Sequence, residues 1–136
     1  MGKLFRLFFI VAFTVATSAA WAATPCAGVN RGLTNARKVA LAPRIAKQLN
    51  VLRVDVLESF QFGGWSFIYV DTHESDDAFL FYSHDPLTSR YLTLWGGSAR
   101  IDEEQGIKDW TIKNASGIPP RLASCFAWRV TNDRRN

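Results

Sequence analysis

The stretch LRVDVLESFQFGGWSFIYV, residues 52–70, decides the fold. Leu52, Val54 and Val56 alternate with polar residues, as expected of a β-strand that buries one face. The pair Gly63–Gly64 suits the left-handed positions of a tight hairpin turn. The run that follows the turn is apolar on both faces, so we expect it to form a central strand.

The alternation loses its phase within the first strand. Glu58 has the same parity as Val54, Val56 and Phe60, although these neighbours in the row are apolar. A β-bulge near Leu57 would insert one extra residue and restore the alternation, and we favour this explanation. The alternative is that Glu58 faces an apolar interior, where desolvation would raise its pKa and indicate a functional site.

Two more strands are expected further along the chain, over residues 78–83 and 91–95. The polar, acidic segment 71–77 precedes the first of them, and the turn at Asp85-Pro86 separates the two. Four consecutive strands joined by short links predict an antiparallel meander.

Helical patterns flank the strands. Upstream, apolar spacings of three and four residues predict a main helix from about Pro43 to Asn50, because proline disrupts a helix interior. Thr34 or Asn35 is expected to cap this region. Downstream, Asp102 and Pro119-Pro120 begin two further helices. The sequence thus predicts an α+β domain, a four-stranded antiparallel meander with one N-terminal and two C-terminal helices packed on one face.

Residues 1–22 have the features of a secretory signal peptide. Lys3 and Arg6 precede an apolar run, and Ala20 and Ala22 supply the small residues required before the cleavage point. We expect cleavage after Ala22, a periplasmic or secreted location and no stable membrane anchor afterwards. Residues 23–136 then form a single domain.

Two cysteines remain after that cleavage, Cys26 and Cys125. An exported protein with one cysteine pair is expected to oxidise it, so we predict a disulfide bond between them. In the chain-entropy model, closing a loop of this length stabilises the fold by about 4 to 5 kcal/mol.

Several function classes are excluded by composition and motifs. The formal charge is +4 at pH 7, but Lys3 and Arg6 lie in the signal peptide and no basic stripe remains, so we expect no nucleic-acid partner. No Gly-x-Ser-x-Gly motif occurs, and neither Ser-His-Asp nor Cys-His catalysis has support. We therefore predict no catalytic residues and no cofactor, and favour a role other than that of an enzyme.

The acidic segment Asp71–Asp77, which includes His73, raises the question of a metal site. Carboxylates suit calcium and a histidine suits zinc. The segment lacks the glycine and spacing of an EF-hand loop, and a turn between apolar strands is expected to be polar in any case. We assign no metal ligand, and whether this loop binds a metal stays open.

The pattern as a whole favours a small exported binding protein without catalytic activity, of the inhibitor or immunity type, whose partner is another periplasmic protein. Its contact surface would use the Ser83–Thr88 and Gly96–Asp102 loops, with a concave aromatic sheet face between them that includes Trp65 and Tyr91. The alternative is a small ligand-binding or hydrolytic domain with a pocket between sheet and helices, built around Glu58, Trp65 and Trp95. The candidate binding residues for the two hypotheses are Glu58, Trp65, His84, Asp85, Tyr91 and Trp95.

Overall fold

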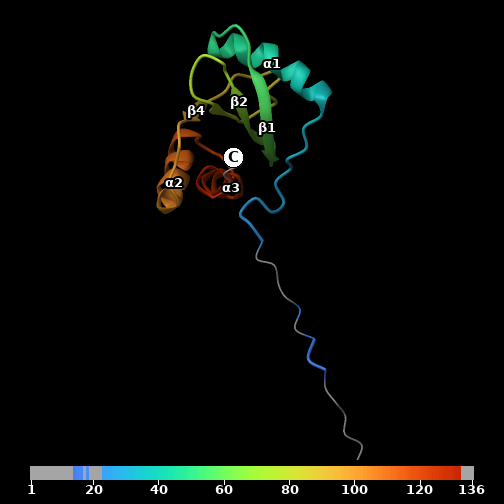
Figure 1. Cartoon of the computed structure of the whole chain (residues 1–136), viewed down its shortest axis with the longest axis vertical. Helices are drawn as coiled ribbons and strands as arrows, with labels where there is room; N and C mark the ends of the chain where they lie inside the picture. Colours follow the sequence, from blue (N-terminus) through green and yellow to red (C-terminus); the bar gives the residue numbers. More distant parts are fainter. Residues whose placement is uncertain (1–13, 17, 19–22, 133–136) are drawn as a thin grey trace, which may run out of the picture.

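The computed structural model describes residues 14–16, 18 and 23–132, so most of the predicted signal peptide lies outside the described residues. The four strands form one antiparallel sheet in the order β1-β2-β3-β4 (Figure 1), which confirms the predicted meander. The elements are α1 (Asn35–Leu49), β1 (Asp55–Phe62), β2 (Trp65–Asp71), β3 (Ala78–Tyr82), β4 (Thr93–Gly96), a short 3-10 helix (Ile101–Glu103), α2 (Glu104–Asn114) and α3 (Pro120–Thr131).

The helices lie on both faces of the sheet, with α1 on one side and α2 and α3 on the other (Figure 1). The prediction that all three pack on one face is therefore wrong, whereas their number and order are confirmed. The reason is that β2 and β3 carry apolar side chains on both faces, and each face requires its own cover. The α1 layer includes Leu41, Ile45, Ile68 and Leu80, and the α3 layer includes Phe67, Phe81, Leu122 and Phe126.

The second helical layer covers the surplus of aromatic residues. We expected some of them to remain as an exposed patch on the sheet, because one layer of helices cannot cover them all. Instead, Phe67 and Phe81 are fully buried, and both make ring contacts with Phe126 of α3. The aromatic sheet face proposed as a contact surface is therefore interior.

The register of β1 against β2 shifts between Val56 and Glu58, which confirms the predicted bulge at Leu57. Val56 belongs to the α1 layer and Phe60 to the α3 layer, although both occupy even positions in the sequence. The extra residue thus moves the second half of β1 to the opposite face of the sheet. Glu58, the first residue after the bulge, lies on the α3 side.

Helix α1 is longer than predicted and contains Pro43 in its interior. Proline there removes the hydrogen bond to the carbonyl of Val39, four residues earlier. Both residues are exposed, so water can satisfy that carbonyl and the helix continues through the proline. The Thr34 hydroxyl accepts a hydrogen bond from the backbone N–H of Arg37 at 3.1 Å, which confirms the expected cap.

The first strand begins later than the alternation indicated. Leu52 is 95% exposed and lies before β1, which begins at Asp55. Cys26 and Cys125 lie at disulfide-bonding distance, with their sulfur atoms 2.10 Å apart, as predicted. In the described part of the chain, no helix combines the length and the hydropathy needed to cross a bilayer.

Candidate functional site

Glu58 is held by two arginines from distant parts of the chain. Arg31, in the segment before α1, donates to Oε1 at 2.8 Å, and Arg129 of α3 donates through Nε to Oε2 at 3.0 Å and also through Nη2. The side chains of Glu58 and Arg129 are 15% and 10% exposed. Glu58 therefore faces inward, as the alternative explanation required, but two guanidinium groups compensate its charge.

Tyr69 and Asp77 form a second polar pair beside Glu58. The Tyr69 hydroxyl donates to Oδ2 of Asp77 at 3.0 Å. Burial raises the pKa of Tyr69 to about 12, and the hydrogen bond to the Asp77 carboxylate adds to this effect. Tyr69 consequently stays protonated at neutral pH and acts as a hydrogen-bond donor.

These residues line a cavity of about 580 Å³, which we call the Glu58 cavity. It lies between the end of the sheet, the segment after β4 and the C-terminal part of α3. Of the predicted binding residues, it brings together Glu58 and Trp95 but not Trp65, which the small-ligand hypothesis placed in the same pocket. Its polar and aromatic lining residues are Glu58, Tyr69, Asp77, Phe79, Trp95, Ser98 and Arg129.

Three other predicted residues, Trp65, His84 and Asp85, line a second cavity of about 480 Å³, which we call the hairpin-end cleft. The Gly63–Gly64 turn and the loop after β3 meet there, as expected for alternate links of a meander. Both glycines have positive φ, as the predicted hairpin turn requires. Arg37 of α1 also lines the cleft.

Asp85 shapes the loop that borders this cleft. Its carboxylate accepts a hydrogen bond from the backbone N–H of Leu87 at 3.0 Å, and Arg37 donates to it at 3.3 Å. The Leu87 bond is the main reason that the pKa of Asp85 lies below its usual value, and Arg37 adds to it. His84 is exposed beside it, with Nδ1 3.0 Å from the Ser83 hydroxyl.

Ser66 of β2 also lines the hairpin-end cleft and is only 3% exposed. Among the described residues, none provides a hydrogen-bond partner for its hydroxyl. A buried hydroxyl without a partner costs about 1 to 3 kcal/mol. Ser66 is therefore an unsatisfied polar group beside the cleft, and because its oxygen is itself buried, a bound molecule reaches it only if the cleft wall moves.

Tyr91 belongs to neither cavity. It is half-buried against the α1 layer, whereas Trp65 packs against the α3 layer. The two aromatic residues therefore lie in different layers and do not form one contact surface, which corrects the prediction that paired them on a concave sheet face.

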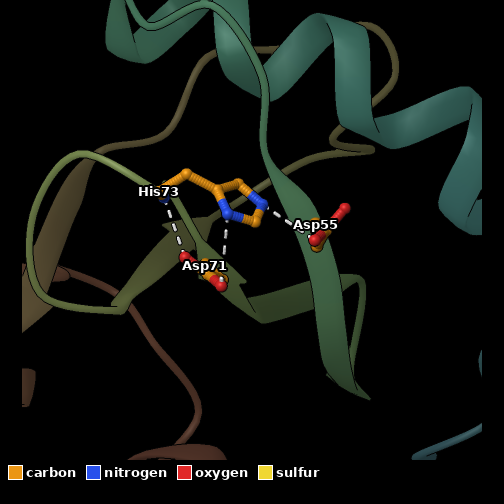
Figure 2. A group of neighbouring side chains, drawn as sticks. All are labelled: Asp55, Asp71 and His73. Atoms are coloured by element: carbon orange, nitrogen blue, oxygen red, sulfur yellow. Dashed lines mark hydrogen bonds and ion pairs between the residues drawn. The ribbon is translucent and has the colours of Figure 1, made fainter.

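Asp55, Asp71 and His73 form a group of potential metal ligands in the described part of the chain (Figure 2). Asp55 and Asp71 are direct cross-strand partners in β1 and β2. Nε2 of His73 is 2.8 Å from Oδ2 of Asp55, and Nδ1 is 3.7 Å from Oδ2 of Asp71. The two carboxylates thus contact different nitrogens of the His73 ring. A metal ion binds only one nitrogen of an imidazole ring, so the group is arranged as a pair of His–Asp contacts.

Sequence reasoning missed Tyr69, Asp77 and Arg129 of the Glu58 cavity, Arg31 as the second partner of Glu58, and Ser66 of the cleft. One signal was present: Arg129 interrupts the apolar pattern of the last helix, and an arginine on a buried helix face needs a carboxylate partner. The others contact residues whose proximity depends on the tertiary fold.

Comparisons with protein families, curated proteins and solved structures found no match to this chain.

Proposed function

We propose that this protein is an exported binding protein without catalytic activity that captures another protein through the hairpin-end cleft. The observation that carries the proposal is the Ser66 hydroxyl, which is buried in the cleft wall without a partner. Such a group destabilises the free protein, and it gains a hydrogen bond if the cleft wall opens on binding and admits a partner's polar side chain, so it favours the bound state.

The surroundings of Ser66 support a protein partner. The cleft volume of about 480 Å³ suits a few inserted side chains, and Trp65 and Arg37, which line it, are residue types that contribute strongly to interfaces. Pro86 and the Asp85 hydrogen bonds restrain the bordering loop, so little conformational entropy is lost on binding.

The variant Ser66→Ala separates binding from folding. We expect its free energy of unfolding to be unchanged or higher than that of the wild type, because an unsatisfied hydroxyl is removed. We expect its affinity for a partner captured from periplasmic extract to fall about ten-fold, the loss of one buried hydrogen bond. Urea unfolding and titration calorimetry measure the two quantities.

His84→Ala is the second variant. We expect it to lower the affinity for the same partner without reducing the free energy of unfolding, because His84 is exposed. Asp109→Ala, at an exposed site on α2 away from the cleft, is the control and should bind as the wild type does. If both cleft variants bind with wild-type affinity, the cleft is not the contact surface.

Export is the second part of the proposal, and it rests on the sequence of residues 1–22. N-terminal sequencing of the protein recovered from the periplasm or the medium should begin at Ala23. Recovery of a chain that keeps Met1 in the membrane fraction would contradict it.

A further inference from the structure

The Glu58 cavity is a site separate from the hairpin-end cleft. The cleft includes the Gly63–Gly64 turn, whereas Gly97 and Ser98, which follow β4, line the Glu58 cavity at the opposite end of the sheet. Its volume of about 580 Å³ lies in the range of small-molecule sites, roughly 300 to 1,000 Å³. Its lining indicates what kind of molecule it accepts.

The charges around the cavity cancel. Glu58 and Asp77 are lining carboxylates and Arg129 is a lining guanidinium group. Arg31 is not part of the lining, but it donates to the other Glu58 oxygen and supplies the second guanidinium group. A charged ligand would add an uncompensated charge to this partly buried network, which is costly at low local dielectric constant. An uncharged ligand avoids that cost.

The cavity is also rich in hydrogen-bonding groups. Asp77 and Glu58 offer carboxylate oxygens, which accept, and the exposed Ser98 hydroxyl both donates and accepts. An apolar ligand would displace water from these groups without replacing its hydrogen bonds. The occupant must therefore carry several neutral groups that both donate and accept.

An aromatic wall completes the lining. Trp95 of β4 packs its ring near Phe79 and Phe126, at centroid distances of 6.2 and 5.7 Å, and remains partly exposed at the cavity. A partly exposed indole offers a flat apolar surface beside the polar groups. A sugar ring matches this combination, since one face presents C–H groups and its edge presents hydroxyls.

We propose that the Glu58 cavity binds a neutral saccharide unit, whose ring stacks on Trp95 and whose hydroxyls bond to Asp77 and Glu58. The arginines hold the Glu58 carboxylate in place rather than bind the ligand themselves. The proposal is independent of the hairpin-end cleft, because the two sites share no lining residue.

Ligand-observed saturation-transfer NMR on the purified full chain tests the proposal with glucose and N-acetylglucosamine as neutral probes and glucuronate and glucosamine as charged ones. We expect saturation transfer to one or both neutral sugars and none to the charged pair. The absence of transfer to both neutral sugars, or equal transfer to charged and neutral ones, would overturn the proposal.

Variants locate the binding. Asp77→Asn should weaken binding of the neutral sugar about ten-fold, the loss of one strong hydrogen bond. Trp95→Leu keeps apolar volume but removes the flat ring and should have a similar effect. Glu74→Gln, an amide substitution at an exposed position of the same loop that lines neither this cavity nor the hollow beside it, is the matched control and should bind as the wild type does.

A cooperative urea unfolding transition reports whether each variant is folded, and the affinity comparison uses the variants that keep such a transition. Asp77 is on the partly exposed rim of the fold, so its variant provides the comparison even if Trp95→Leu unfolds. Wild-type affinity in a folded Asp77→Asn protein would exclude this cavity as the site.

Discussion

At Glu58, one carboxylate joins three parts of the chain: β1, the segment before α1 through Arg31, and α3 through Arg129. Both arginines also lie over aromatic rings, with Arg31 4.4 Å from the centroid of Phe60 and Arg129 5.5 Å from that of Tyr69. The guanidinium groups are therefore positioned by packing as well as by charge. Buried ion pairs of this kind add little net stability, but removing one partner alone is strongly destabilising because it leaves the other charge uncompensated.

We predict that Glu58→Ala destabilises the protein by about 2 to 4 kcal/mol, because the largely buried Arg129 and the partly exposed Arg31 lose their shared carboxylate. The double variant Glu58→Leu with Arg129→Met should lose clearly less, because it replaces the pair with apolar side chains instead of separating it. Urea unfolding of the single and double variants measures both values. A double variant that is less stable than Glu58→Ala would show that the pair is a net stabilising interaction.

At the scale of the element, α1 contains a defect that its surroundings tolerate. Pro43 removes a backbone hydrogen bond on the exposed side of the helix, while Leu41 and Ile45 remain fully buried against the sheet. Tertiary burial of the apolar stripe thus outweighs the local preference against proline.

We predict that Pro43→Ala stabilises the protein by roughly 1 to 3 kcal/mol, because it restores the hydrogen bond to the Val39 carbonyl. This is a net value, since the unfolded chain gains conformational entropy when proline is replaced, which offsets part of the gain. Pro120→Ala is the matched control, since Pro120 occupies the first turn of α3 where a missing N–H costs nothing. It should give no increase in the midpoint of thermal unfolding. Equal gains from both substitutions would contradict this explanation.

The elements were predictable where the signal is local. Gly63–Gly64, the alternation around Leu57 and the Pro119-Pro120 pair each specify a turn, a bulge or a helix start through their own backbone preferences. The apolar residues on both faces of residues 65–70 already indicated that each face needs cover, but which helix lies on which face was not predictable in this way, because it depends on the path of the folded chain. For the same reason, Glu58 was found by sequence and its partner Arg129 was not.

At the scale of the molecule, the Cys26–Cys125 bond fastens the segment before α1 to the last helix. The same segment pairs with β1 through Asn30 and Gln61, whose backbone groups exchange two hydrogen bonds of 2.9 and 2.8 Å. Arg31 follows directly after this bridge. The disulfide therefore also holds one of the two arginines near Glu58.

We predict that Cys26→Ser with Cys125→Ser lowers the free energy of unfolding by about 4 to 5 kcal/mol, the loop-closure value for a bond that spans nearly the whole domain. Urea unfolding of the double variant and of the oxidised wild type measures the difference. Adding a reductant should lower the wild-type midpoint to that of the variant and leave the variant unchanged. Two freely alkylating thiols in the native exported protein would instead show that the bond does not form.

Because of the bulge at Leu57, the number of residues in β1 determines which helical layer each of its side chains faces. Side chains alternate along a strand. Inserting or deleting one residue therefore moves every side chain beyond that position to the opposite face of the sheet. Val56 faces the α1 layer and Phe60 the α3 layer only because Leu57, which has no paired residue in β2, lies between them. Many substitutions at Leu57 can keep that arrangement, but deleting it would send either the first half of β1 or the second to the wrong layer.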